Sequence, residues 1–292
     1  MSNAPAAGPI VQLFHNSVSG SYCPARMQAL GEALRCCGAE VTATESGNAP
    51  PVIDPRATHV CVAGGDGTVR HVFMALARSG CNIPAAIFPS GTINLLAREA
   101  GYSADPVAFA RRLLGGGEER KHYPVTINDT RFFACASAGP DSFAIARLSA
   151  PLKRKIGRAA YVAALLGLLR RWPRPRMVLT MDGRSLACEA VYIAKGRYFA
   201  GPWSLAPEAR LTDKTLHVVA LKCARRRDFL RFAWALLRGC DPATLPGVIA
   251  LRGRQLTLEC DGSVSIPVQG DGDIIASLPA RVKLTGETVT LC

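Results

Sequence analysis

Short apolar runs alternate with helix-like segments over the first third of the chain. Ile10–Phe14, His59–Ala63 and Ala85–Phe88 are rich in β-branched, aromatic and small apolar residues and predict buried strands. Apolar residues recur at helical spacing in Pro24–Cys36 and Val69–Ala77, which follow the first and second of these runs. This alternation predicts an α/β fold with a doubly wound, mostly parallel sheet, in which ligands bind at the carboxyl ends of the strands.

The pattern changes near His122, where a series of strand-like runs replaces the alternation. Phe132–Ala136 and Leu186–Ala194 are two of these runs, and helical segments at Arg158–Arg171 and Arg227–Arg238 interrupt the series. We therefore expect an α/β domain over residues 1–121 and a β-rich domain over residues 122–292, the second resembling an antiparallel β-sandwich with inserted helices. At 292 residues the chain is long enough for each domain to bury its own core.

Polar turns follow three of the strands predicted in the first domain. One strand runs into Gly64-Gly65-Asp66-Gly67-Thr68, another into Pro89-Ser90-Gly91-Thr92-Ile93-Asn94, and the first is followed by Asn16. Glycine permits positive φ and a close approach of backbone N–H groups to an anion, and the helix that follows offers the positive end of its dipole. The turns therefore predict a polyphosphate site with Asn16, Thr68, Thr92 and Asn94 as neutral hydrogen-bonding groups, although each alone is more often a turn former or a helix cap.

Asp66 is the unusual residue of the first glycine turn. A carboxylate beside a phosphate site repels the ligand unless it holds Mg²⁺ or takes a proton from an attacking hydroxyl. A catalytic role for Asp66 is therefore the more economical interpretation, and the alternative is an ordinary glycine turn.

Composition adds a preference for anionic partners. The chain has 35 Lys and Arg against 22 Asp and Glu, a formal net charge of +13, which suits nucleotides, anionic lipid headgroups or nucleic acid. No nucleic-acid-binding module is recognisable, so nucleic acid is not an expected partner. The 11 cysteines include no CxxC pair and several lie in apolar runs, which predicts reduced, buried thiols. The sequence contains neither a secretory signal nor an apolar helix of membrane-spanning length, and we expect a cytoplasmic protein with peripheral membrane contact.

The two glycine turns, in this order and spacing, resemble those of the diacylglycerol kinase catalytic family. That family includes sphingosine, ceramide and bacterial lipid kinases and is more distantly related to NAD kinases. The resemblance continues through Gly139-Pro140-Asp141, Lys155–Tyr161, Ala206–Ala209 with Asp213, and Gln269–Asp273. It implies a kinase that transfers the γ-phosphate of ATP, with Mg²⁺, to the hydroxyl of a diacylglycerol, ceramide or sphingoid base. The first domain would then bind ATP and the second the lipid.

The resemblance also implies roles for single residues. Thr44, with Thr42 as the alternative, joins the residues expected to bind the nucleotide, which are Asn16, Gly64, Gly65, Asp66, Gly67, Thr68, Gly91, Thr92 and Asn94. Asp273 stands where bacterial relatives have the glutamate assigned as proton acceptor, whereas sphingosine kinase relatives use the position of Asp66, and both carboxylates stay candidates for the base. Asp141 is expected to help fix the lipid headgroup. Asp213 matches a loop that holds a structural Mg²⁺ in some bacterial relatives, although Lys214 replaces the usual glycine.

Clusters of arginine and aromatic residues suit docking on an anionic membrane. They lie in Leu152–Arg158, Arg170–Arg176 and Arg225–Arg238, with rings expected at the interface and cations on phosphates. The same rings have helical spacing, so the alternative is that they belong to the core and that the arginines form a solvated face. The sequence leaves a homodimer open.

Two rival functions belong to other classes. An NAD kinase-like soluble kinase shares the first glycine turn, but its companion Asn-Glu motif is not evident after Phe88. A non-catalytic nucleotide-binding regulator would use the basic surface, but Asp66, Asp141 and Asp273 favour catalysis. The sequence has no Walker-type P-loop and no protein-kinase signature, which disfavours those classes of ATP-using enzyme.

Overall fold

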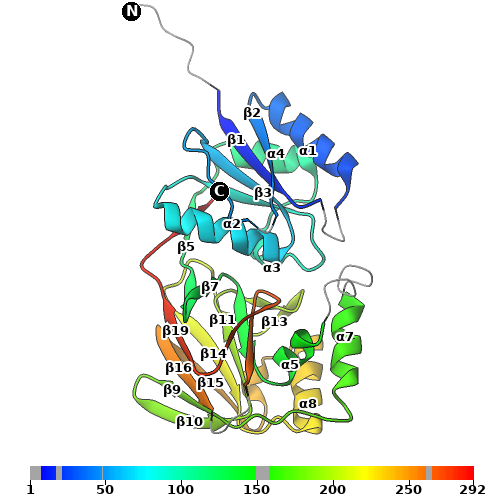
Figure 1. Ribbon diagram of the computed structural model, residues 1–292, viewed down its shortest axis with the longest axis vertical. Helices are drawn as coiled ribbons and strands as arrows, with labels where there is room; N and C mark the ends of the chain where they lie inside the picture. The colour runs from blue at the N-terminus through cyan, green and yellow to red at the C-terminus, as the bar shows by residue number, and fades with distance from the viewer. Residues whose placement is uncertain (1–7, 18–21, 48, 149–157, 261–264) are drawn as a thin grey trace, which may run out of the picture. The chain divides into compact units, whose positions relative to one another are not determined.

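The computed structural model describes residues 8–17, 22–47, 49–148, 158–260 and 265–292. The chain folds into two compact units (Figure 1): unit 1 contains residues 1–121 and 289–292, and unit 2 contains residues 122–288. Strand β20 (Val289–Leu291) explains this division, because it pairs with a strand of the first sheet, and the C-terminus lies among the elements of unit 1. The second domain expected over residues 122–292 thus loses residues 289–292 to unit 1. Within the described part of the chain, no helix is long and apolar enough to cross a membrane.

Unit 1 is built on one sheet, called sheet 1. Its strands in spatial order are β2 (Glu40–Glu45), β1 (Ile10–His15), β3 (His59–Gly64), β4 (Ala85–Pro89), β20 and β5 (Arg120–His122). The pairs β1–β2, β1–β3, β3–β4 and β4–β20 are parallel. Strands β1 and β3 are buried along most of their length, as expected for parallel strands covered on both faces. The predicted α/β fold is confirmed.

Four helices accompany sheet 1 in the described part of unit 1: α1 (Pro24–Cys36), α2 (Asp66–Ser79), α3 (Leu95–Ala100) and α4 (Pro106–Leu114). Helix α1 packs against α4 and β2, and α2 packs against β3 and β20. Helix α2 starts two residues after β3 ends, and α3 starts shortly after β4 ends. These short connections place both glycine turns at the carboxyl ends of neighbouring strands.

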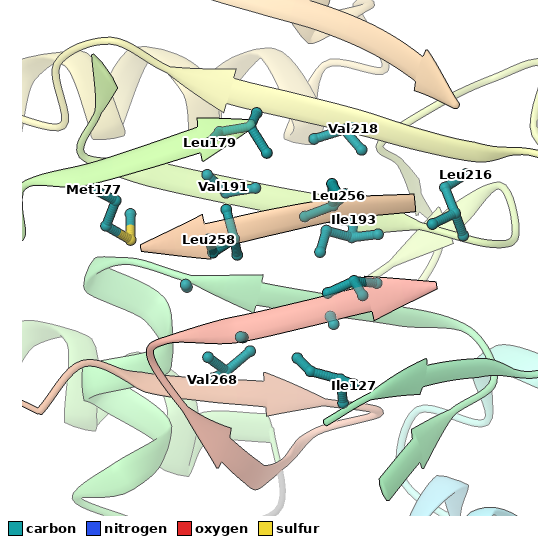
Figure 2. Packing of buried hydrophobic residues seen from close by; sticks show 14 of the residues in the cluster. Ile127, Met177, Leu179, Val191, Ile193, Leu216, Val218, Leu256, Leu258 and Val268 are labelled. Carbon is teal, nitrogen blue, oxygen red and sulfur yellow. The ribbon is translucent and has the colours of Figure 1, made fainter. Parts of the chain in front are cut away.

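Unit 2 is a sandwich of two antiparallel sheets. Sheet 2 contains, in spatial order, β10 (Arg184–Cys188), β9 (Met177–Met181), β16 (Gln255–Cys260), β19 (Ala280–Leu284), β6 (Val125–Ile127) and β7 (Thr130–Phe132). Sheet 3 contains β15 (Val248–Gly253), β14 (Leu216–Leu221), β11 (Ala190–Ala194), β8 (Cys135–Ala138), β17 (Pro267–Gly270) and β18 (Asp273–Ser277). Figure 2 shows apolar side chains of the two sheets, such as Leu258 and Val191, together in one buried core. The predicted sandwich is confirmed.

The second face of sheet 3 is covered by helices. These are α5 (Pro140–Ala146), α7 (Arg158–Gly167) and α8 (Arg226–Leu237), and the short elements β12 (Tyr198–Phe199), β13 (Trp203–Ser204) and η1 (Pro242–Thr244) complete the unit. Phe229 and Phe232 of α8 are buried against Tyr192 of sheet 3, and Leu165 of α7 packs on the same cluster. The Trp172 ring contacts Phe229, and its Nε1 donates to the Ala224 carbonyl at 2.7 Å. For Phe229 and Phe232 the core interpretation is right and the membrane interpretation is wrong, whereas Trp172 is only half-buried.

Two runs predicted as single strands are each divided between the sheets. Leu186–Ala194 belongs to β10 in sheet 2 and to β11 in sheet 3, and Phe132–Ala136 is divided in the same way between β7 and β8. At the first crossing, the Glu189 backbone N–H donates to the Leu221 carbonyl at 2.9 Å, and the Glu189 carboxylate accepts from the Ala224 N–H at 2.8 Å. Backbone groups at such corners leave the sheet ladders and need other partners.

The 11 cysteines all lie among the described residues and form no disulfide, as predicted. Cys61, Cys135, Cys188 and Cys292 are buried, and burial raises the pKa of the Cys188 thiol to about 12. The prediction that the thiols are buried is wrong for others, since Cys36, Cys37, Cys81, Cys223 and Cys240 are exposed.

Candidate active site

The two glycine turns of unit 1 lie against each other. A Cβ atom added to Gly91 would lie 2.3 Å from Cα of Gly65, and one added to Gly64 would lie 2.6 Å from Cβ of Thr68. Gly65 is extended, with φ of −84° and ψ of 177°, and Gly64 has no positive φ either. The expectation that positive φ explains these glycines is therefore wrong. Gly91 has to be glycine because its backbone packs on that of Gly65, and a side chain at Gly64 would collide with the Thr68 side chain.

Asp66 joins the two turns. It is the first residue of α2, and its Oδ1 accepts from the Leu95 backbone N–H at the start of α3, at 2.7 Å. Asn94 fixes the second turn from inside, because its Oδ1 accepts from the Gly91 N–H at 2.8 Å and its Nδ2 donates to the Gly91 carbonyl at 2.7 Å. Asn94 has φ of 55°, a conformation that asparagine tolerates better than most residues. The first N–H groups of an α-helix have no partner within the helix and point outward from its start, an arrangement that suits an anion.

The other nucleotide residues predicted in unit 1 surround these turns. Nδ2 of Asn16, just after β1, lies 3.5 Å from Oγ1 of Thr68, so the structure brings these two side chains together. Thr92 is exposed in the second turn. Thr44 lies on β2, where its Oγ1 accepts from Nε2 of Gln12 at 3.3 Å, and Thr42 is exposed on the same strand. The ATP contacts assigned to these residues stay predictions.

Gln12 is a polar residue of unit 1 that was not predicted from the sequence. It is buried in β1, where its Nε2 also donates to the Val52 carbonyl at 3.0 Å and its Oε1 accepts from the Asp54 N–H at 2.9 Å. The signal for it was an isolated polar residue within the apolar run Ile10–Phe14. Its amide fixes the segment after β2 beside Thr44.

Unit 2 carries a row of polar side chains across three neighbouring strands. Tyr192 of β11 and Gln269 of β17 are both in register with Ser137 of β8. All three are buried, and because residues before and after them face the sandwich core, they face the helical side of sheet 3. None of these three residues was predicted as a site residue; a serine within the buried strand Cys135–Ala138 was the available signal.

Asp141 lies over this row. The Ser137 hydroxyl donates to its Oδ2, and burial raises the pKa of the Asp141 carboxyl to about 6, against the lowering effect of the Ser137 and Tyr192 hydroxyls. Gly139 brings the start of α5 onto the sheet: its φ is +151°, and an added Cβ would lie 2.8 Å from Cβ of Ala190. The predicted substrate residue thus has a carboxyl whose pKa lies above its ordinary value of 3.8 because of burial.

Asp273 begins β18, and its position is set by the turn before it. The carboxylate of Asp271 accepts from the backbone N–H groups of Phe133 and Ala134, both at 2.8 Å, and of Cys135 at 3.2 Å. The Gly272 N–H donates to Oε1 of Gln269 at 3.0 Å. Asp271 is thereby a structural anchor at the crossing from β7 to β8, whereas Asp273 is only half-buried and lies next to it.

Asp213 lies in the loop before β14, and the metal site implied there does not fit the residues present. Nζ of the fully buried Lys195 donates to the carbonyls of Arg210, Leu211 and Asp213, at 3.2, 2.6 and 2.7 Å. In the described residues, no group of three or more His, Cys, Asp and Glu side chains is arranged to hold a metal ion. The backbone oxygens that a hard cation would use are bound to an ammonium group.

A basic pocket of about 630 Å³ lies on unit 2. It is lined by Arg170, Arg171, Trp172, Arg174, Arg225, Arg226 and Arg227. Nearby apolar side chains are exposed at helical spacing, at Leu230, Trp234 and Leu237 on α8 and at Val162 and Leu166 on α7. The basic segment and the motif predicted at residues 152–157 lie outside the described residues.

Comparison with known proteins confirms the resemblance drawn from the motifs. Residues 12–123 match the diacylglycerol kinase catalytic domain, and residues 134–292 match the YegS C-terminal NAD kinase beta sandwich-like domain. A Pseudomonas aeruginosa protein named "Probable lipid kinase YegS-like" is 33% identical over 236 residues, which cover 76% of this chain and 72% of that protein. A Mycobacterium tuberculosis protein named diacylglycerol kinase is 29% identical, with the same coverage. A crystal structure of a diacylglycerol kinase from Bacillus anthracis has the same fold, with a TM-score of 0.76, 19% identity, and coverage of 97% of this chain and 96% of that one.

Proposed function

We propose that this chain, which belongs to the lipid kinase family that joins a diacylglycerol kinase catalytic domain to a YegS-type C-terminal domain, transfers the γ-phosphate of ATP to a lipid hydroxyl. Diacylglycerol is the first acceptor to test, because one relative carries that name. Ceramide and sphingoid bases follow as alternatives.

The observation that carries this proposal is the locked pair of glycine turns in unit 1. Phosphoryl transfer depends on positioning the triphosphate and neutralising its charge. The contact of Gly91 with Gly65 and the hydrogen bond from Leu95 to Asp66 hold the backbone N–H groups at the start of α2 in a fixed place. Such preorganised donors need no rearrangement when the phosphates bind.

The acceptor hydroxyl also has to lose a proton. Asp66 and Asp273 both remain candidates for the base, and Asp141 with Ser137 and Tyr192 would hold the lipid headgroup by hydrogen bonds. Mg²⁺ enters as part of the MgATP substrate, where it neutralises phosphate charge. The Asp66 carboxylate is suited either to bind Mg²⁺ or to accept the proton. Removal of its charge should therefore slow phosphoryl transfer whichever of the two roles it has.

The lipid would be met at a membrane surface on the cytoplasmic side, where ATP is present. Six arginines line one pocket, and such a concentration of positive charge favours anionic phospholipid headgroups. Trp234 and Leu230 are exposed on the neighbouring helix α8 and suit the apolar boundary of the bilayer. We therefore propose peripheral docking through this surface. A homodimer stays a prediction.

The test is ATP consumption by the purified chain with a panel of acceptors. Vesicles containing diacylglycerol, ceramide or a sphingoid base are compared with soluble NAD, which is included because the C-terminal match is described as NAD kinase-like. We expect phosphorylation of a vesicle lipid. Phosphorylation of NAD alone would overturn the proposal, and ATP binding without turnover on any acceptor would favour a non-catalytic regulator.

Asp66→Asn tests the catalytic assignment in the same assay. The variant keeps the Oδ1 acceptor for the Leu95 N–H but loses the charge, so we expect kcat to fall by roughly a thousandfold, within the range for a lost catalytic acid or base, with an unchanged Tm. Asp129→Asn, at an exposed position of unit 2, makes the same chemical change and should keep normal turnover. Near-normal turnover of Asp66→Asn would contradict the assignment.

A further inference from the structure

The Lys195 ammonium lies at the centre of a cluster of backbone carbonyls. Lys195 directly follows β11, and its side chain is fully buried. Three carbonyls from one loop, those of Arg210, Leu211 and Asp213, converge on Nζ at 2.6–3.2 Å. An ammonium group has three N–H donors and no acceptor, so this cluster uses its hydrogen-bonding capacity in full.

The groups around Lys195 favour a positive charge on the lysine and a neutral His122 beside it. His122 is also fully buried, and its Nδ1 lies 3.2 Å from the same Leu211 carbonyl. Burial, and next the charge of Lys195, lower the pKa of the His122 imidazole to about 3, so it is neutral at physiological pH. A buried ammonium is costly unless its hydrogen bonds are satisfied. The loop supplies that satisfaction, and the lysine in turn binds together carbonyls that would otherwise face one another.

Converging carbonyl oxygens of this kind are also what a hard divalent cation coordinates. Mg²⁺ requires oxygens at about 2.0–2.1 Å in an octahedral arrangement and keeps several waters. The ammonium fills the centre of the cluster at ordinary hydrogen-bond distances, so the cation and the ammonium exclude each other.

We propose that Lys195 takes the place of a structural divalent cation in unit 2. Its ammonium group holds the loop of Arg210–Asp213 against the end of β11 by direct hydrogen bonds. The fold of unit 2 is therefore independent of Mg²⁺, although the chain resembles relatives whose loop holds that metal. The inference does not depend on which lipid is phosphorylated.

The first experiment uses the full-length wild-type chain without nucleotide, so that catalytic Mg²⁺ does not contribute. The protein is dialysed against EDTA, its metal content is measured by mass spectrometry, and its Tm is recorded before and after addition of millimolar Mg²⁺. We expect less than stoichiometric metal and a Tm that stays within about 1 °C throughout, because a fold that binds no cation gains nothing from it. A Tm that falls by about 5 °C or more in EDTA and recovers with Mg²⁺ would overturn the proposal.

The second experiment compares two Lys→Met variants of the same region. Lys195→Met removes one buried ammonium that donates to three backbone carbonyls, of which that of Leu211 is buried, so we expect Tm to fall by about 10 °C. Lys214→Met makes the same change at an exposed position of the same loop, where the ammonium lies 5.1 Å from the centroid of the Tyr123 ring, and should shift Tm by about 2 °C at most. Equal, small shifts in the two variants would contradict the proposal. If Lys195→Met fails to fold, the metal measurements on the wild type still decide it.

Discussion

The candidate sites of the two units are built from different chemical groups, backbone groups in unit 1 and side chains in unit 2. In unit 1 the site is made by backbone: Gly65 and Gly91 touch through their main chains, and the Leu95 N–H fixes the Asp66 carboxylate. In unit 2 it is made by side chains, with Asp141 lying over Ser137 and Tyr192 from adjacent strands. The first construction offers fixed dipoles to a highly charged ligand, and the second offers a carboxyl whose protonation responds to its surroundings.

This difference predicts different kinds of sensitivity. A backbone site tolerates pH but not added volume, because a single methyl group separates surfaces that must touch. A buried side-chain site tolerates small changes of shape but depends on protonation and hydrogen bonding. Substitutions that conserve charge in unit 1 and volume in unit 2 test this distinction.

Gly91→Ala should have the largest effect among these tests. Its new Cβ would lie 2.3 Å from Cα of Gly65 and 2.6 Å from Oδ1 of Asn94, so the two turns must move apart. We expect ATP affinity to fall about thirtyfold, which corresponds to roughly 2 kcal/mol, when measured by calorimetry. Gly47→Ala, also in unit 1 but with open space around the added Cβ, should bind ATP normally. Unchanged affinity in Gly91→Ala would show that contact between the turns is not needed for the nucleotide.

Asp141→Asn should have an intermediate effect that depends on pH. Because burial raises the pKa of this carboxyl from 3.8 to about 6, the native state binds more protons than the unfolded chain between these values. Stability is therefore lost as pH rises through that range, and the loss persists above it. Asparagine has no charge to bury, so we expect its Tm to exceed that of the wild type by roughly 5 °C at pH 8, with the gap narrowing steadily below pH 6.

Asp141→Asn should weaken lipid binding although it raises Tm. If Asp141 holds the lipid headgroup, the KM for the lipid should rise about tenfold, the cost of one weakened hydrogen bond to a charged group, with the ATP affinity unchanged. The exposed Asp129→Asn should show neither effect. A Tm gap that is the same at pH 5 and pH 8 would contradict the buried carboxyl, and an unchanged KM would contradict its role with substrate.

The site in unit 1 could be predicted from the sequence, whereas the polar row of unit 2 could not. The glycine turns and Asp66 are contiguous in the chain, and the parallel strands that precede them bring their ends together by a general rule of α/β folds. The polar row of unit 2 is assembled from Ser137, Tyr192 and Gln269, which lie far apart in the chain and become neighbours only through strand register. No local pattern specifies that register, so the row was not predicted.

The strand crossings were missed for a related reason. Hydrophobic periodicity is continuous through Leu186–Ala194 even though the chain leaves sheet 2 and enters sheet 3 within it. The backbone groups at the crossings bond to distant parts of the chain: the Glu189 N–H donates to the Leu221 carbonyl, and the Asp271 carboxylate accepts from the amides of Phe133 to Cys135. The place of β20 in sheet 1 could not be predicted from local patterns either, because it depends on the return of the chain to unit 1.

The smallest effect is expected at the basic pocket, which belongs to neither of the two candidate sites. Replacing Arg225, Arg226 and Arg227 by Ser removes three of the cations that line it, and serine at position 225 is a favourable cap for α8. Each cation near an anionic surface contributes on the order of 1 kcal/mol at most, and physiological salt screens part of it. We therefore expect activity on lipid in anionic vesicles to fall only about fivefold, with a weaker salt dependence, and activity on a short-chain soluble analogue to be unchanged.

A matched variant separates this pocket from net charge in general. Arg184, Arg254 and Arg281 are exposed residues on or beside sheet 2, and replacing them by Ser also lowers the net charge by three without touching the pocket. That variant should keep vesicle activity close to the wild type if docking is local, whereas a fivefold loss in both variants would mean that overall charge attracts the chain to the membrane. Equal loss on vesicles and on the soluble analogue in the pocket variant, with its fold intact by circular dichroism, would show that these arginines support the reaction itself.

The docking surface would then have to be sought at the exposed apolar residues of α7 and α8. There, Trp234→Ser should lower vesicle binding in low and high salt alike, because an inserted ring is held by apolar burial rather than by charge.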